Sequence, residues 1–344
     1  MKKIAIEEHF YTEGYLDFLR SNKGYPRLEV VENEEHQSIW RWYDSSDSYK
    51  VWNPHLMRAP IDIGEGRLKE MDTAGIDMQV LSLAKPGVEE FNAVDGTEVA
   101  KLSNNELSQV IQKYPGRFAG LAALATQDPA AAANELERAV KGLGLKGANI
   151  NSHVKGEYLD DEKYWVIFET AEKLGVPIYL HPKEPPQGML ESYLTYPRLA
   201  SSMWGFAADA GLHAMRLILS GVFDKYPALK IVLGHMGEAL PYWLWRMDKS
   251  WARGRVTTGA LNVKMQKVPS QYVKDNFLVT TSGMFWEPAF LCAYLGLGAD
   301  KILFAVDYPF ESSKEAVQFM DSVSICDTDR EKIYHLNAEK LLSL

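Results

Sequence analysis

The sequence predicts an α/β protein built as a (β/α)8 barrel of the TIM type. Short apolar runs alternate with helical patterns eight times along the chain. The runs are rich in Val, Ile and Leu, which is typical of parallel strands buried on both faces. The length of 344 residues suits one barrel of this kind. We therefore expect a single barrel domain over residues 1–344.

The predicted elements follow one another in a regular order. The first strand, Ile4–Phe10, precedes a long segment that ends near Gly64, and from there each helix leads into a strand. The expected pairs of helix and strand are Gly66–Ala74 with Met78–Leu83, Val99–Tyr114 with Phe118–Leu124, Pro129–Lys141 with Leu145–Ile150, Asp161–Leu174 with Pro177–His181, Arg198–Tyr226 with Leu229–His235, Leu240–Ala252 with Phe277–Thr281, and Pro288–Leu297 with Ile302–Asp307, before two closing helices.

The segment 21–64 interrupts this rhythm, and we expect it to be an aromatic-rich loop inserted after the first strand. A loop of this length in a compact domain is usually functional or has structure of its own. Two roles stay open. The aromatic side chains pack on the barrel or on a neighbouring subunit, which we favour slightly, or the segment is a lid that touches a substrate. The aromatic residues concerned are Trp40, Trp42, Tyr43, Tyr49 and Trp52.

Composition and charge argue against several kinds of partner. The net charge is −9 and no long run of Lys or Arg occurs, so we expect no binding to nucleic acid. We also expect no membrane span and no signal peptide, because the apolar runs are too short for either. The two cysteines, Cys292 and Cys326, have neither metal-type spacing nor a disulfide framework, which favours a cytoplasmic location.

Titratable side chains stand at the ends of four predicted strands. Glu7 and His9 share one face of the first strand, because residues two apart on a strand point the same way. His181, His235 and Asp307 end the fifth, sixth and eighth strands. The functional residues of such barrels lie at the C-terminal ends of the strands, so these side chains are expected at one rim. Imidazole and carboxylate together suit Zn²⁺ or Mn²⁺.

The same residues also allow structural interpretations that involve no metal. Glu7 and His9 fit an edge strand whose polar end frays into a loop. His181 fits a histidine that is buried and hydrogen-bonded in the core. The coincidence of four strand ends favours a metal site over both interpretations.

At these positions the chain resembles the amidohydrolase superfamily, in its branch of metal-dependent aromatic-acid decarboxylases. The motifs that carry the resemblance are Glu7-x-His9, Tyr179–Pro182, Leu233–Glu238 and Phe304–Glu311. The γ-resorcylate, 2,3-dihydroxybenzoate and 5-carboxyvanillate decarboxylases have similar motifs. Many hydrolytic relatives carry His-x-His on the first strand, whereas Glu7 stands here in place of the first histidine, as is typical of the decarboxylases.

The resemblance implies a role for each site residue. Glu7, His9, His181 and Asp307 would hold one divalent metal ion, Zn²⁺ or Mn²⁺. His235 would lie behind the ligands or act as a catalytic histidine, with Glu238 hydrogen-bonded near it. The chemistry of ring protonation makes Asp307 the first candidate for the proton donor, because a general acid must stand within hydrogen-bond reach of the ring carbon. His235 would then polarise the phenol or relay the proton, with Glu238 fixing its orientation. Glu238 has the alternative of complementing the dipole at a helix N-terminus.

Two further residues are expected to contact the substrate. Arg246 matches an arginine that binds substrate carboxylate in the carboxyvanillate enzymes. The alternative role for Arg246 is a structural ion pair within the protein. Phe310 stands where that branch has a tyrosine, which favours a plainer hydroxybenzoate-like acid as the substrate.

The expected activity is therefore non-oxidative decarboxylation of an aromatic, ortho-hydroxylated carboxylic acid, by protonation of the ring followed by loss of CO₂. The alternatives are a hydrolase or hydratase of the same superfamily, for example a lactonase, and a binding or scaffold subunit with an unused barrel. The resemblance also implies a homodimer or a homotetramer.

Overall fold

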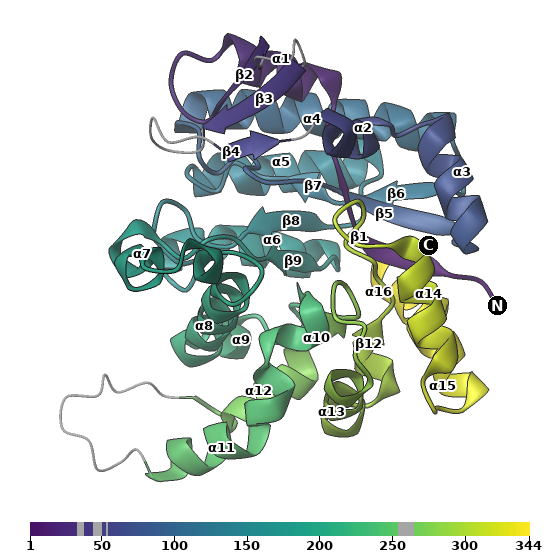
Figure 1. The fold of residues 1–344 in the computed structure, drawn as a ribbon. Coiled ribbons are helices and arrows are strands. Elements are labelled where there is room, and N and C mark those ends of the chain that lie inside the picture. The colour runs from purple at the N-terminus through teal and green to yellow at the C-terminus, as the bar shows by residue number, and fades with distance from the viewer. Residues whose placement is uncertain (33–37, 44–49, 53, 254–264) are drawn as a thin grey trace.

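The computed structural model describes residues 1–32, 38–43, 50–52, 54–253 and 265–344, and within these ranges it leaves the side chains of residue 52 and of residues 54–57 undescribed. A central barrel of parallel strands is surrounded by helices (Figure 1). The strands of the barrel are β1 (Ile4–Phe10), β5 (Met78–Leu83), β6 (Phe118–Gly120) continued by β7 (Ala122–Ala123), β8 (Ala148–Asn151), β9 (Ile178–His181), β10 (Ile231–Leu233), β11 (Phe277–Thr280) and β12 (Ile302–Leu303).

Parallel pairing runs from β1 through β5 to β6, and from β7 in chain order to β12. Strands β6 and β7 are separated only by Leu121, whose amide donates to the Leu81 carbonyl at 2.9 Å. The other join lies between β1 and the residues that follow β12. There the Ile6 amide donates to the Phe304 carbonyl at 3.1 Å, and the His9 amide donates to the Tyr308 carbonyl at 2.7 Å. These bonds connect the two ends of the sheet, and the predicted barrel class is confirmed.

The last strand is shorter than the sequence predicts. β12 ends at Leu303, and the next residues turn their backbone toward β1 instead of continuing along β11. The Asp307 amide donates to the Glu7 carbonyl at 3.0 Å, and Asp307 has a φ of 79°, in the left-handed region. This turn places Asp307 directly beside the end of the first strand.

The helices form the outer layer, and the helix Pro129–Leu143 is capped at both ends. Asp128 caps the helix that begins at Pro129, and Gly144 closes it in the left-handed conformation at φ 75°. The helices are α1 (Glu13–Ser21), α2 (Pro54–Ile61), α3 (Glu65–Ala74), α4 (Ala93–Lys113), α5 (Pro129–Leu143), α6 (Trp165–Leu174), α7 (Gln187–Leu194), α8 (Gly205–Ser220), α9 (Val222–Lys225), α10 (His235–Glu238), α11 (Leu240–Arg253), α12 (Pro269–Asn276), α13 (Glu287–Leu297), α14 (Ser313–Ser322), α15 (Asp327–Glu331) and α16 (Asn337–Leu342).

The barrel interior is apolar below the site. Ile4 and Ile6 of β1 pack there with Val80, Tyr179 and other inward side chains of the strands. The register between β1 and β5 shifts between Ala5 and Glu8, as in a β-bulge. Each of these interior residues is at most 2% exposed, so the core supports the strand ends from beneath.

The segment 21–64 has secondary structure of its own. Strands β2 (Arg27–Glu32), β3 (Ser38–Tyr43) and β4 (Lys50–Trp52) form a small antiparallel sheet, and α2 leads from it back to the barrel. This sheet lies at one end of the molecule, near α1 (Figure 1). Trp42 is 3% exposed and its ring centroid lies 5.4 Å from that of Tyr11, so it packs on the barrel. Tyr49 lies outside the described residues.

In the described part of the chain, no helix has both the length and the apolar character that crossing a membrane requires.

Candidate active site

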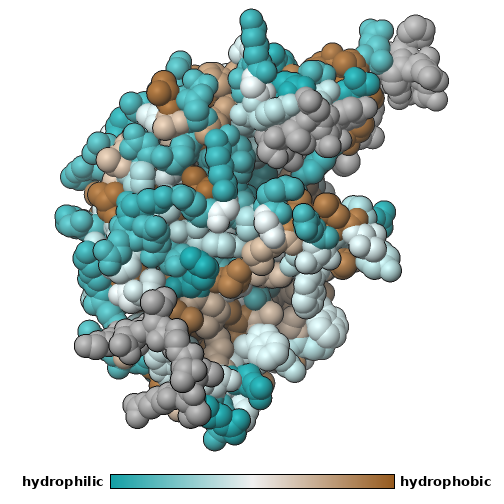
Figure 2. Space-filling model, turned by 90° about the vertical axis from the view of Figure 1, so that its left-hand side faces the viewer, coloured by the Kyte–Doolittle hydropathy of each residue, from teal (hydrophilic) through white to brown (hydrophobic). Residues whose placement is uncertain are grey.

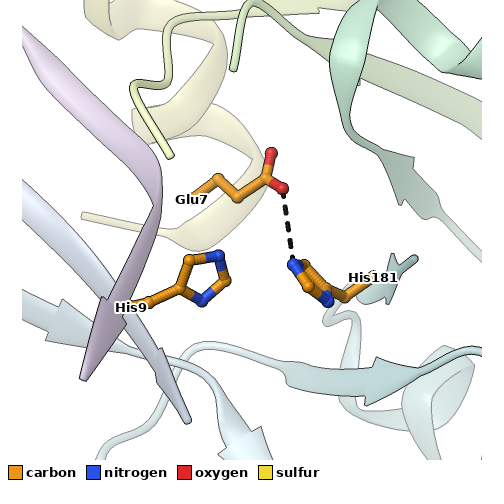
Figure 3. A group of neighbouring side chains, drawn as sticks. All are labelled: Glu7, His9 and His181. Carbon is orange, nitrogen blue, oxygen red and sulfur yellow. Dashed lines mark ion pairs between the residues drawn. The ribbon is translucent and has the colours of Figure 1, made fainter. Parts of the chain in front are cut away.

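Three of the predicted metal ligands meet at the rim of the barrel (Figure 3). Glu7 and His9 project from the end of β1, and His181 ends β9. One ligand atom from each residue lies within 4.8 Å of the others. Glu7 Oε1 is 3.8 Å from His181 Nε2, and the two imidazole centroids are 4.7 Å apart in an edge-on arrangement. The strand ends therefore bring one carboxylate and two imidazoles together.

Asp307 joins this group from residues 304–308, which hydrogen-bond to β1 where the barrel closes. We call this junction the seam. Its Oδ1 lies 3.0 Å from His9 Nε2, and its Oδ2 lies 3.7 Å from His235 Nε2. Asp307 therefore stands between the predicted ligand His9 and the predicted catalytic histidine His235.

The chemistry of the donors fits a divalent cation. Glu7 is 1% exposed, and its Oε2 accepts hydrogen bonds from the hydroxyls of Tyr179 and Thr280. Within the described residues, its Oε1 has no hydrogen-bond partner although it is buried. Burial raises the pKa of Glu7, so a neighbouring cation would stabilise its ionised form. Burial, with the adjacent His9, lowers the pKa of His181, which keeps this imidazole neutral and able to bind a metal.

His235 is held by an unusual backbone segment. The five residues from His235 to Ala239 all have positive φ, with values of 51°, 57°, 81°, 49° and 65°. This left-handed turn brings Glu238 Oε1 within 2.8 Å of His235 Nδ1. Burial lowers the pKa of His235, but the carboxylates of Glu238 and Glu7 outweigh it and raise that pKa well above the ordinary value. Glu238 thus contacts the histidine from a buried position, at 4% exposure.

Several residues that support the site were not singled out from the sequence. The Ser282 hydroxyl accepts from the His235 amide at 3.1 Å and lies 2.8 Å from the Thr280 hydroxyl. Tyr179 and Thr280 bind the Glu7 carboxylate, as described above. Tyr179 stands two residues before His181, so strand alternation could have placed both on the same inward face. No comparable sequence signal marks Thr280 and Ser282. They reach the site because β11 pairs with β10.

The two predicted substrate residues lie in different places. Phe310 is half exposed, and its ring centroid lies 5.6 Å from that of His9, so it borders the ligand cluster. Arg246 is exposed on α11 and lines a cavity of about 730 Å³ between α8 and α11, which Glu238 also lines. The structure thus places Phe310 beside the predicted metal ligands and Arg246 on an adjoining surface.

Comparison with known proteins agrees with this geometry. Residues 34–344 match the family described as Amidohydrolase. The chain belongs to this family. A γ-resorcylate decarboxylase from Polaromonas sp. strain JS666 is 39% identical over 351 residues, which cover 99% of this chain and 98% of that protein.

Solved structures of decarboxylases resemble the whole amidohydrolase chain. The 5-carboxyvanillate decarboxylase from Sphingomonas paucimobilis superposes with a TM-score of 0.88 at 34% identity, covering 100% of this chain and 99% of that one. A dihydroxybenzoic acid decarboxylase from Polaromonas sp. JS666, solved with manganese and the inhibitor 2-nitroresorcinol, has a TM-score of 0.84 at 37% identity. It covers 100% of this chain and 97% of that one.

The left-handed turn gives a test of stability. We expect Gly237→Ala to lower the free energy of unfolding by at least about 1–2 kcal/mol, because a left-handed backbone costs this much for a residue with a Cβ. A Cβ at this position would also lie 2.6 Å from Val279 Cγ1. Gly142→Ala on α5 is the control, because it meets no atom within 4 Å and is expected to be stabilising. Urea unfolding measures both, and a Gly237→Ala protein as stable as the wild type would contradict the expectation.

Metal content gives a second test. The wild-type protein, loaded with Mn²⁺ and then dialysed, is expected to retain one ion per chain. His181→Asn should retain much less, because it removes one imidazole donor from the cluster. His335→Asn, on a helix outside the cluster, should retain as much as the wild type. Elemental analysis of the folded proteins gives the ratios. Equal retention by His181→Asn and the wild type would exclude His181 as a ligand.

Proposed function

We propose that this amidohydrolase is a metal-dependent, non-oxidative decarboxylase of an ortho-hydroxylated aromatic carboxylic acid, with γ-resorcylate-like acids as the substrate class. The observation that carries the proposal is the position of Asp307, which contacts both the proposed ligand His9 and the proposed catalytic His235. The similarity to γ-resorcylate and dihydroxybenzoic acid decarboxylases supports the same reaction.

In this proposal Glu7, His9, His181 and Asp307 hold one divalent ion, Zn²⁺ or Mn²⁺. When bound, the ion would act as a Lewis acid that orients the substrate and favours ionisation of its ortho hydroxyl. The buried Glu7 Oε1, which has no hydrogen bond within the described residues, and the neutral His181 supply donors suited to it.

The proton needed at the ring carbon is proposed to come through His235 and Asp307. Burial alone would raise the pKa of Asp307, but its contacts with the His235 and His9 rings hold that pKa below its ordinary value. Asp307 is thus ionised at rest, and His235 is the protonated partner. His235 gives its Nε2 proton toward Asp307, which passes it to the ring carbon, and CO₂ leaves from the protonated ring. Glu238, at Nδ1, keeps the imidazole in the orientation this transfer requires.

Phe310 and Arg246 are proposed to shape the substrate site. The ring of Phe310 lies beside His9, where it offers an apolar face to an aromatic acid. Arg246 is a candidate for binding a carboxylate, and it shares a cavity with Glu238, whose own carboxyl contacts His235.

The central experiment tests Asp307. Mn²⁺-loaded wild-type protein is expected to release CO₂ from γ-resorcylate and to form the corresponding phenol. Asp307→Asn should fold normally and lose at least about 10²–10⁴-fold in turnover, the usual contribution of a positioned general acid. Product formation followed by NMR, beside circular dichroism, measures both. Near-normal CO₂ release by Asp307→Asn would remove Asp307 from this role, and ring-opened or hydrated products would favour the hydrolase alternative.

We also propose that the protein assembles as a homodimer or homotetramer through α11 and the neighbouring α8. Tyr242 and Trp245 of α11 are 75% and 71% exposed, and Trp243 lines the apolar cavity against α8. Exposed aromatic side chains of this kind are enriched at protein interfaces. Brown and pale side chains interrupt the hydrophilic surface in the lower half of the face shown in Figure 2.

Assembly is measured by light scattering during size-exclusion chromatography. The wild type is expected at twice or four times the chain mass of 38.8 kDa. Trp245→Lys should shift it toward the monomer, because a charge would be buried at the interface. Val94→Lys, at an exposed position on α4, should leave the mass unchanged. A monomeric wild type would contradict this proposal and leave the proposed reaction standing.

We further propose a cytoplasmic location, because Cys292 and Cys326 are both free thiols.

A further inference from the structure

A second group of buried polar side chains lies behind the metal cluster, on the outer face of β1. Glu8 stands between Glu7 and His9 and points the opposite way. Glu8 contacts Gln79 of β5, which in turn contacts Arg67 of α3, and all three side chains are 0% exposed. The Arg67 Nε donates to Gln79 Oε1 at 2.7 Å, and Gln79 Nε2 donates to Glu8 Oε2 at 3.2 Å. Gln79 thus bridges a buried cation and a buried anion.

Both ends of this network bind backbone atoms of the proposed metal site. Arg67 Nη2 donates to the carbonyl oxygen of His9 at 2.8 Å. At the other end, Glu8 Oε1 accepts from the amide of Val306 at 3.0 Å, one residue before Asp307. The guanidinium carbon of Arg67 also lies 4.6 Å from the ring centroid of Tyr308, one residue after Asp307. The network therefore contacts both sides of the seam at the level of the ligands.

Stability does not readily explain a buried group of this kind. Removing an Arg and a Glu from water is costly, and well-packed apolar residues of similar size are often at least as stabilising. Met71 of α3 and Ala5 and Phe10 of β1 belong to the buried apolar core, so these two elements already pack apolar side chains. Apolar contacts do not orient their partners. Hydrogen bonds do, so only the polar group fixes the His9 carbonyl and the Val306 amide relative to each other.

We propose that Arg67, acting through Gln79 and Glu8, is a positioning residue for the metal site. It fixes the backbone at His9 against the segment that carries Asp307, so that ligands from the two ends of the chain are aligned before an ion binds. This inference rests on the proposed metal site and deepens it. Arg67 touches neither the ion nor the substrate, and its effect is carried by the backbone.

The test compares Mn²⁺ affinity in the metal-free full-length protein, measured by electron paramagnetic resonance. Arg67→Lys keeps the charge but cannot bind the His9 carbonyl and Gln79 together. We expect it to weaken Mn²⁺ binding about 10–100-fold, the usual effect of losing a group that orients metal ligands. Arg330→Lys is the matched control. Arg330 also donates to backbone carbonyls, those of Met320 and Val323, neither of which adjoins the site. The Arg330→Lys protein should bind Mn²⁺ as tightly as the wild type.

Glu8→Gln is the second variant, and it decides the question if Arg67→Lys does not fold. It retains an oxygen for the Val306 amide but removes the charge that Arg67 requires, so weaker Mn²⁺ binding is again expected. A folded Arg67→Lys or Glu8→Gln protein with wild-type affinity would overturn the proposal. Wild-type protein that binds no Mn²⁺ would instead count against the proposed metal site itself, so the two failures are distinguishable.

Discussion

The site depends on the backbone seam between β1 and residues 304–308. Hydrogen bonds across the seam hold Glu7 against Asp307 and His9 against Tyr308. Without them, the proposed ligands from opposite ends of the chain would not lie together, because the entropy of closing so long a loop opposes their meeting. The apolar interior beneath the site, and the helices around the barrel, offset that cost through burial.

Three acidic side chains lie at this seam, and the carboxyl group of each has different polar partners. Glu7 faces inward and receives the hydroxyls of Tyr179 and Thr280, whereas Glu8 faces outward and binds Gln79 and the Val306 amide. Asp307 lies against the imidazoles of His9 and His235. Burial raises the pKa of Glu7 and of Glu8. Glu7 and Asp307 face the site, where a divalent ion would offset the repulsion between their carboxylates, whereas Glu8 points away from it.

Backbone strain is concentrated at the same place. The left-handed turn from His235 to Ala239 and the positive φ of Asp307 both occur at residues proposed to handle the proton. Conformations of this kind persist only where the surrounding structure enforces them, and they cluster at functional sites. Here the turn brings Glu238 onto His235, and the bend at Asp307 directs its carboxylate toward both histidines.

Much of the architecture was determined by the sequence itself. Alternating apolar runs predicted every strand of the barrel, and the period of two over residues 7–9 correctly paired Glu7 with His9 and set Glu8 apart. The bulge between Ala5 and Glu8 was not predicted, and it breaks the period so that Ile6 and Glu7 both face inward. The prediction missed α1, although its buried Tyr15, Leu16 and Leu19 have helical spacing, and it missed the antiparallel sheet β2–β4 within the inserted segment. It also extended the last strand to Asp307, where the backbone turns away after Leu303.

Only the tertiary structure decided the distances on which the chemistry depends. Strand ends and motifs marked Glu7, His9, His181, His235, Glu238 and Asp307. The 3.0 Å contact of His9 with Asp307 and the support from Thr280 and Ser282 arise from neighbouring strands distant in sequence. The Arg67 network and the exposed place of Arg246 are equally products of packing. Sequence periodicity fixes which face a side chain occupies, whereas barrel closure and strand register fix what it meets there.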